Sequence, residues 1–289
     1  MKVYTMPASQ NTRAAMERPP LPDFVHPPLT EVALSIQFEE LSNFRVIHLG
    51  SLWEAFSKET FPRFEEQPPV PTSLEAMGVP QIASGPQFQL LDIPPMPRYL
   101  FLSDKTSFVV QVQQDRFTVN WRRRSISDLY PRFEAVLSEF ENLANRFNQF
   151  LSNNNLGEIR VTQAEVSYVN RIETAELPAD VDRIVSVLSN RYSDGFLHDP
   201  EELNLSLRFP IFEKDQLRGR LHINARTGAL LGSNNPMNLM LLARGKPQGN
   251  DIKAALDFFA IGRKYIVSAF ASVTSKEMHS KWERTDHDD

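Results

Sequence analysis

Cysteine is absent from the 289-residue sequence, and this absence excludes several kinds of chemistry at once. Without a thiol the chain forms no disulfide, zinc ribbon or cysteine-held iron–sulfur cluster, and it uses no cysteine nucleophile. A chain without disulfides suits a reducing compartment, so we expect a cytoplasmic protein. Long apolar runs are lacking too. No stretch approaches the roughly 20 apolar residues that a transmembrane helix requires, so we expect no membrane span.

A dominant charge of one sign is also lacking. The 31 basic and 36 acidic residues give a formal net charge of −5. This balance argues against electrostatic binding of nucleic acid by the whole protein surface, although it is compatible with a local basic patch. With 41% apolar residues and 20 phenylalanines, the chain can bury a sizeable core.

Proline, by contrast, is plentiful and marks the irregular parts of the chain. Residues 1–27 contain prolines but no apolar segment typical of a signal peptide, so we expect an extended lead there. Residues 62–87 combine several prolines with no sustained hydrophobic period, which predicts a long irregular excursion. Residues 275–289 carry mixed charges, and we expect a solvated tail after a frayed helix end.

Two stretches of the sequence, residues 29–38 and 163–172, read alike. They come into register at Glu31 and Glu165, which lie 134 positions apart. In the first stretch, larger apolar residues alternate with small or polar ones, the period of a strand with one buried face. This similarity indicates an internal duplication.

Each of these stretches opens a similar order of elements, with a short helix, several strands and a long amphipathic helix. The expected helices lie at residues 46–56, 133–151, 179–188 and 252–273. The expected strands lie at residues 30–38, 88–92, 99–103, 107–113, 116–122, 161–172, 203–209, 217–225 and 237–243. The sequence therefore predicts two structural repeats, residues 28–157 and 158–274.

This order of elements predicts an α+β fold. Two β-α-β(3–4)-α halves would join into one curved antiparallel sheet with both long helices on one face. The arrangement resembles the duplicated fold of the TATA-binding-protein type. An alternative is the helix-grip fold, in which a sheet wraps one long helix and leaves a ligand cavity. Two long helices and two similar opening strands favour the first arrangement, which leaves the concave face of the sheet free.

The free face can be identified from the alternation of side chains along each strand. It is polar and rich in arginine, and guanidinium groups offer bidentate donors for phosphate or carboxylate. The alternative interpretation is a solvated face with cross-strand charge pairs. The candidate ligand-binding residues are Glu31, Arg122, Glu165, Arg171, Arg208, Arg218, Arg220, His222 and Arg244.

Three of these residues could carry acid–base chemistry. Glu31 and Glu165 occupy equivalent positions and could act as an acid/base pair or hold a divalent metal. No third ligand follows at a suitable spacing, so strand carboxylates paired with arginines are the alternative. Nearby positive charge would favour the neutral form of His222, the form that acts as a base; the alternative is a surface hydrogen bond. The six histidines show no metal-ligand spacing, and we expect no metal or cofactor.

A basic run at residues 121–124, Trp-Arg-Arg-Arg, is typical of a site that binds a nucleic-acid backbone and stacks a base on the indole. However, Phe117, Val119 and Trp121 share one face of the predicted strand, which favours Trp121 in the core. The resemblance to the TATA-binding fold concerns the order of elements alone, and DNA binding does not follow from it.

Three motifs resemble a sporadically distributed, uncharacterised prokaryotic family over most of residues 27–270. They are PLTEVALSIQF at residues 28–38, VQQDRFTVNWR at residues 112–122 and AEVSYVNRI at residues 164–172. The resemblance implies no established activity, cofactor or catalytic residue. The patchy occurrence of the family is compatible with mobile or phage-defence gene sets.

The sequence leads to three hypotheses about function. The first is a non-catalytic binding or interaction module that recognises a protein partner or an anionic small molecule through the arginine-rich face. The second is a nucleic-acid-binding protein. The third is a hydrolase-like enzyme that uses Glu31, Glu165 and His222.

Overall fold

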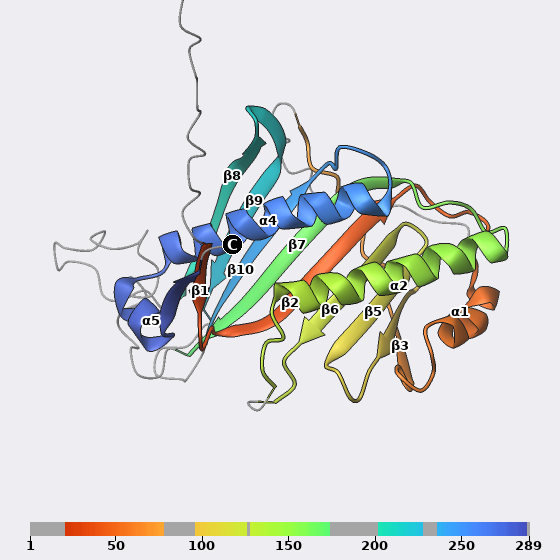
Figure 1. Ribbon diagram of the computed structural model, residues 1–289, viewed down its shortest axis with the longest axis horizontal. Helices are drawn as coiled ribbons and strands as arrows, with labels where there is room; N and C mark the ends of the chain where they lie inside the picture. The colour runs from red at the N-terminus through yellow and green to blue at the C-terminus, as the bar shows by residue number, and fades with distance from the viewer. Residues whose placement is uncertain (1–20, 78–95, 126–127, 174–201, 228–235, 288–289) are drawn as a thin grey trace, which may run out of the picture.

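Nine antiparallel strands form one sheet at the centre of the molecule (Figure 1). The computed structural model describes residues 21–77, 96–125, 128–173, 202–227 and 236–287. The strands of the sheet are β2 (Leu29–Phe38), β3 (Arg63–Gln67), β4 (Arg98–Leu102), β5 (Phe108–Gln113), β6 (Arg116–Arg122), β7 (Val161–Ile172), β8 (Asn204–Glu213), β9 (Gln216–Arg226) and β10 (Met237–Gly245). The α+β class and the large antiparallel sheet that the sequence predicts are confirmed.

The order of the strands places β2 and β7 side by side in the middle of the sheet. Across the sheet the strands run β3-β4-β5-β6-β2-β7-β10-β9-β8. On its other side, β2 pairs with β6, the last strand before the first long helix. In the same way, β7 pairs with β10, the last strand before the second long helix. The two halves of the chain therefore meet along the β2–β7 pair, where Ala33 lies opposite Ser167.

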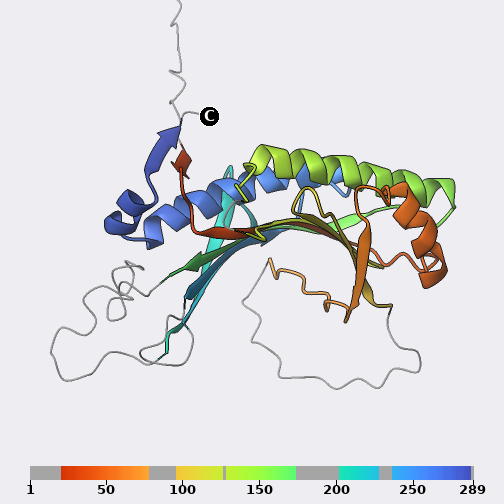
Figure 2. The same ribbon diagram turned by 90° about the horizontal axis from the view of Figure 1, so that it is seen from below.

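Both long helices cover the same face of the sheet, and the sheet arches beneath them (Figure 2). The helices are α1 (Leu49–Ala55), α2 (Phe133–Asn153), α4 (Ile252–Val273) and α5 (Lys276–Lys281). On β2, the side chains of Val32, Leu34 and Ile36 are fully buried, in line with the alternation that turns every second residue toward the helices. The opposite, concave face carries no helix among the described residues. None of the described helices is long and apolar enough to cross a membrane.

Aromatic rings join the sheet to both helices. Phe117 of β6 stacks on Phe147 of α2 with ring centroids 5.4 Å apart. It also meets Phe140 of α2 edge-on at 5.6 Å. Phe140 in turn meets Phe259 of α4 edge-on at 4.9 Å, so that one chain of rings connects the two helices. All four rings are fully buried, and the burial of each contributes roughly 1.5–3 kcal/mol.

The structure differs from the sequence-based expectation at three places. The predicted irregular excursion contains the edge strand β3, whose one large apolar side chain, Phe64, gives no readable period. The predicted tail forms α5 and β11 (Arg284–His287). β11 pairs with β1 (Leu21–Phe24) from the predicted lead, and the two form a separate small sheet near the end of α4 (Figures 1 and 2). The expected strand at residues 88–92 and the expected helix at residues 179–188 lie outside the described residues.

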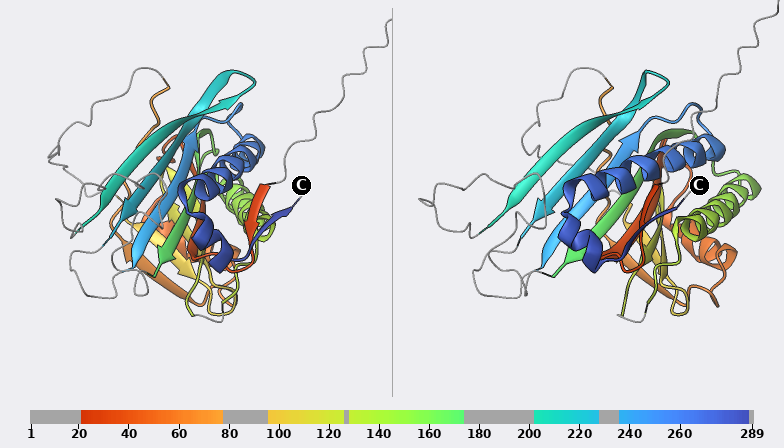
Figure 3. Two further views of the ribbon diagram at one scale, coloured as in Figure 1. Left: turned by 90° about the vertical axis from the view of Figure 1, so that its left-hand side faces the viewer. Right: turned by 60° about the vertical axis from the view of Figure 1, so that its left-hand side comes forward.

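The hairpin of β8 and β9 projects past α4 at one edge of the sheet (Figure 3). Its two-residue turn consists of Lys214 and Asp215, with φ angles of 46° and 63°. Two consecutive positive φ angles correspond to a type I′ turn, whose twist matches that of the paired strands. The turn thus fixes the register of β9, the strand with the highest density of candidate arginines.

Helix α4 approaches the sheet closely because a glycine lies on each side of their contact. A Cβ atom on Gly245 of β10 would lie 2.1 Å from the carbonyl oxygen of Arg218 and 2.6 Å from the Phe258 ring of α4. On the helix, a Cβ atom on Gly262 would lie 3.0 Å from Val166 of β7. The seating of α4 therefore depends on the absence of side chains at these two positions.

Substitution of Gly245 by alanine tests this close approach. We expect Gly245→Ala to lower the free energy of unfolding by about 3 kcal/mol, because the methyl group forces β9 or α4 to shift. Gly50→Ala serves as the control, since no atom lies within 4 Å of the added Cβ in α1. There we expect stabilisation of up to about 1 kcal/mol from higher helix propensity. Urea unfolding of both variants measures the difference, and equal stability of the two would contradict the packing described.

Candidate functional site

A row of polar side chains runs across the middle of the concave face. The strand register aligns one residue from each of the neighbouring strands β5, β6, β2, β7, β10 and β9. In that order, the residues of the row are Gln111, Thr118, Ser35, Glu165, Arg244 and Arg220. The first four are buried although the face carries no described helix. Buried polar groups need hydrogen-bond partners, so this layer must be held by its own contacts.

Glu165 is the centre of those contacts. Its carboxylate lies 3.1 Å from Nε of Arg244 and 3.5 Å from Nη1 of Arg116. It also accepts hydrogen bonds from Nε2 of Gln37 at 2.5 Å and Nε2 of Gln163 at 2.9 Å. Glu165 is only 7% exposed, so its charge is balanced by two guanidinium groups rather than by water.

Glu31 forms the corresponding contact in the first half of the chain. It lies opposite Arg122 in the register of β2 and β6, and Nε of Arg122 approaches its carboxylate to 3.2 Å. Glu165 likewise lies opposite Arg244 in the register of β7 and β10. Both carboxylates thus form cross-strand pairs with arginine. This pairing is the alternative to an acid/base pair that the sequence pattern left open.

The register separates the residues of the hypothetical enzyme. Glu165 lies opposite Ser35, which is four residues along β2 from Glu31, or roughly 13 Å at about 3.3 Å per residue. The backbones are this far apart, and each carboxylate is bound by its own arginines, so the two side chains are not placed to share a proton or a metal ion. Within the described part of the chain, no group of three or more histidine, aspartate and glutamate side chains is placed to hold a metal ion.

Residues 68–77, called the strap below, cross the concave face on the side away from the helices (Figure 2). Two glutamines of the sheet bind the main chain of the strap. Gln113 accepts from the Val70 N–H and donates to the Val70 carbonyl, both at 2.9 Å. Gln163 accepts from the Glu75 N–H at 2.6 Å and donates to the Ser73 carbonyl at 2.7 Å. This recognition uses backbone groups and therefore places little demand on the side chains of the strap.

Two strap side chains reach the basic residues of the second half. The Glu75 carboxylate lies 2.8 Å from Nε2 of His222, and the Ser73 hydroxyl accepts from Nη1 of Arg244 at 3.1 Å. Both side chains of the Glu75–His222 pair are largely buried. His222 is therefore engaged with a carboxylate of the chain itself, which the sequence pattern did not reveal.

The other candidate arginines differ in how they are paired. Arg171 and Arg218 lie near acidic side chains, with Arg171 at 3.2 Å from Glu173 and Arg218 at 3.7 Å from Glu213. Arg208 is exposed opposite His222, and Arg220 lies next to Arg244. No carboxylate of the described residues lies within ion-pair distance of Arg208 or Arg220. The second half of the face therefore carries two guanidinium groups whose charge no carboxylate of the described residues neutralises.

The basic run at residues 121–124 is occupied by internal contacts. Trp121 is only 2% exposed, so its ring is in the core as its strand position predicts and is not free to stack on a base. The Arg123 guanidinium packs over that ring, 6.0 Å from its centroid. Arg124 donates to the carbonyls of Ser103 and Asp104 at 3.0 Å and 2.9 Å. These contacts remove the main observation behind the nucleic-acid hypothesis.

Comparison of the chain with protein-family models, curated proteins and solved structures finds no match. Function must therefore be inferred from the site itself. The structure brings Glu165, Arg244 and His222 together with the strap, whereas Glu31 and Arg122 form a separate pair. Arg116 was missed by sequence reasoning, although it shares the alternation of its neighbours Thr118, Asn120 and Arg122. Ser73 and Glu75 carry no period that could have indicated them.

The balance of charge at Glu165 gives a stability prediction. We expect Glu165→Gln to lower the free energy of unfolding by about 3 kcal/mol, because Arg116 and Arg244 lose the charge that compensates them in a buried site. Glu31→Gln is the matched control in the other half. Its ion pair with Arg122 is more exposed, and we expect a loss below about 1 kcal/mol. Chemical unfolding compares the two variants, and losses of equal size would show that Glu165 is not the centre of the polar layer.

Proposed function

We propose that the protein is a non-catalytic binding module whose concave sheet face holds an extended, acidic segment of a protein partner. The observation that carries this proposal is the strap. The face already seats a length of polypeptide, whose main chain is bound by Gln113 and Gln163 and whose acidic residue Glu75 is bound by His222. The strap therefore supports the proposal that the face accommodates an extended, acidic segment.

The second half of the face extends this chemistry beyond the strap. Arg220 lies beside Arg244 across the β9–β10 pair, and Arg208 lies beside His222 across the β8–β9 pair. A carboxylate placed against either arginine would gain a charge-assisted hydrogen bond, which is stronger than a bond between neutral groups. An acidic segment that lies beside Glu75 would therefore meet two further guanidinium groups.

Several buried polar atoms of the face have spare hydrogen-bonding capacity. Oε1 of Gln37 and Nε of Arg116 and Arg218 have no hydrogen-bond partner among the described residues. Nε of Arg244 lies close to Glu165, but not in hydrogen-bond geometry. Buried polar atoms without partners are unfavourable, and because these atoms are shielded from solvent, they reflect the cost of burying the polar layer and are not contacts for a bound segment.

We also infer that the two halves of the sheet arose by internal duplication, in an arrangement like the TATA-binding-protein type. Each opening strand pairs with the last strand of its own half, and each carries a glutamate opposite an arginine of that strand. Glu31–Arg122 and Glu165–Arg244 are these two pairs. The proposed function uses the differences between the halves, since the exposed Arg208 and the neighbouring Arg220 both belong to the second.

The proposal is tested by binding of poly-L-glutamate, an acidic polypeptide without defined sequence. We expect the double variant Arg208→Ala/Arg220→Ala to bind about tenfold more weakly than the unaltered protein, since a hydrogen bond to a charged group contributes roughly 1.5–3 kcal/mol. Isothermal titration calorimetry at low salt measures the affinity. The control is Lys253→Ala/Lys264→Ala, which removes the same charge from exposed positions on α4, and its affinity should stay unchanged.

Two outcomes would contradict the proposal. An equal loss of affinity in the α4 variant would mean that poly-L-glutamate senses overall charge alone. Tighter binding of a single-stranded DNA oligonucleotide than of poly-L-glutamate, with an affinity that falls steeply with salt, would assign the face to nucleic acid instead.

A further inference from the structure

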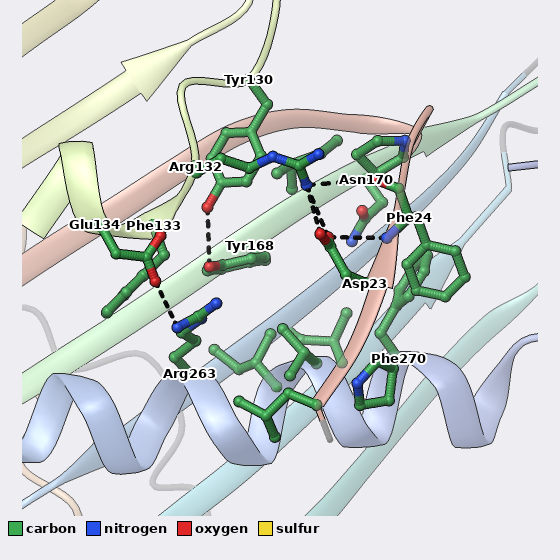
Figure 4. A pocket seen from close by; sticks show the side chains of 17 residues that line it. Asp23, Phe24, Tyr130, Arg132, Phe133, Glu134, Tyr168, Asn170, Arg263 and Phe270 are labelled. Atoms are coloured by element: carbon green, nitrogen blue, oxygen red, sulfur yellow. Dashed lines mark hydrogen bonds and ion pairs between the residues drawn. The ribbon is translucent and has the colours of Figure 1, made fainter. Parts of the chain in front are cut away.

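A cavity of about 340 Å³ lies between the sheet and α4 (Figure 4), on the helix-covered face and so away from the strap (Figure 2). It is enclosed by β1, by the start of α2 and by the middle of α4, and its floor is formed by β7 and β10. Its volume falls in the lower part of the range of about 300–1,000 Å³ that is usual for small-molecule sites. None of its lining residues belongs to the concave face described above.

The walls of the cavity carry charges that cancel. Arg132 donates to both carboxylate oxygens of Asp23, at 2.8 Å and 2.9 Å. Arg263 donates to the Glu134 carboxylate at 2.7 Å and lies over the Phe133 ring. Each guanidinium group is thus paired with a carboxylate at the rim (Figure 4). A cavity with balanced charges favours a neutral ligand over an ion.

Two tyrosines supply neutral polar groups inside the cavity. The hydroxyls of Tyr130 and Tyr168 lie 3.1 Å apart and share a hydrogen bond. Burial raises the pKa of Tyr168 to about 12, and burial also raises the pKa of Tyr130 well above its usual range. Both side chains therefore stay protonated near neutral pH and can exchange hydrogen bonds with an uncharged group.

Asn170 provides a second polar group, and its amide oxygen has no donor among the described residues. The residue is 3% exposed and lines the cavity. Its amide nitrogen donates to the Leu239 carbonyl at 3.2 Å, whereas no described residue donates to its Oδ1. An amide oxygen beside the cavity can accept a hydrogen bond from a ligand that carries an N–H or O–H group.

The backbone beside the cavity is strained. Arg132, the residue before α2, has φ of 74° and ψ of 159°, a conformation that residues with a side chain rarely adopt. Strain of this kind gathers at binding sites, where surrounding contacts hold it in place. Here the contact between Arg132 and Asp23 ties the strained residue to β1 and so closes one side of the cavity.

We propose that this cavity binds a small neutral molecule that has an apolar body and a hydrogen-bonding head, such as a phenol, an alcohol or an amide. The head donates to Oδ1 of Asn170 and joins the hydroxyls of Tyr130 and Tyr168. The body packs against Val267 and Phe270 of α4 and the other apolar lining residues. This site is independent of the concave face.

A second cavity, of about 500 Å³, lies on the other side of α4 and offers a comparison. Its lining includes Tyr265, whose hydroxyl accepts from the Phe212 N–H at 2.9 Å and donates to the Phe212 carbonyl at 3.0 Å. The polar group of Tyr265 is thus already satisfied by the protein. Ala269 lines this second cavity and stands two positions after Val267 on the same helix, which makes the two residues a matched pair for substitution.

Calorimetric titration with 2-naphthol and 2-methoxynaphthalene tests the proposal. The two probes share a ring system, but only 2-naphthol carries an O–H donor. We expect the unaltered protein to bind 2-naphthol at least about tenfold more tightly, because only this probe satisfies Asn170. Val267→Trp fills the cavity and should abolish the binding of 2-naphthol. Ala269→Trp fills the second cavity and should leave the affinity for 2-naphthol unchanged.

Tyr168→Phe keeps the shape of the site and removes one hydroxyl, so it should weaken the binding of 2-naphthol by about tenfold. This variant tests the site even if Val267→Trp fails to fold. Circular dichroism shows whether each variant is folded. Three results would overturn the proposal: no heat of binding for 2-naphthol with the unaltered protein, equal affinity for the two probes, or undiminished binding in folded Val267→Trp.

Discussion

The antiparallel pairing of β2 with β7 is the constraint on which the rest of the structure depends. Side chains alternate along a strand, so this register decides which residues of both halves face the helices and which face the strap. It turns Val32 and Val166 toward α2 and α4, and it sets Ser35 opposite Glu165 on the concave side. A shift by one residue would place the Glu165 carboxylate in the aromatic core and expose valines to the strap. The apolar core and the polar layer are therefore fixed by the same contact.

The polar layer explains why the strap lies where it does. A sheet face that buries Gln37, Gln163 and Glu165 must satisfy their hydrogen bonds, since an unpaired buried polar group costs about 1–3 kcal/mol. The strap has no helical or sheet hydrogen bonds of its own, and its free N–H and carbonyl groups meet this need. The face and the strap thus satisfy each other, and the same complementarity underlies the proposed binding of an extended partner segment.

The sequence predicts those parts of the molecule whose pattern is local. The strands Arg116–Arg122 and Val161–Ile172 and the two long helices have strong periods, and they are found where the periods place them. The tendency of Glu31 and Glu165 to pair with arginine could also be inferred from strand neighbours. By contrast, β1 and β11 are four-residue strands from opposite ends of the chain, and nothing local in either one indicates the other.

The residues of the cavity were beyond prediction for a related reason. Asp23, Arg132 and Arg263 come from three distant segments, and each reads on its own as an ordinary surface charge. Asn170 stands between Tyr168 and Ile172 on the helix-facing side of β7, where alternation predicts an apolar core position. An amide at such a position conflicts with the local pattern, and conflicts of this kind concentrate at functional sites. That conflict is the one signal in the sequence that could have drawn attention to the cavity.

Strand β7 carries both proposed sites on its two faces, with Glu165 toward the strap and Asn170 toward the cavity. The two residues stand five positions apart, or roughly 16 Å at about 3.3 Å per residue. The strand pairs with β2 on one side and with β10 on the other. Energetic coupling requires an element with two alternative arrangements that both ligands bias. Strand β7 is fixed by its neighbours and by the close packing of α4, so it has no second arrangement that a ligand could favour. Substitutions at sites this far apart usually have additive effects on the free energy of unfolding. We therefore expect the two proposed sites to bind their ligands independently of each other.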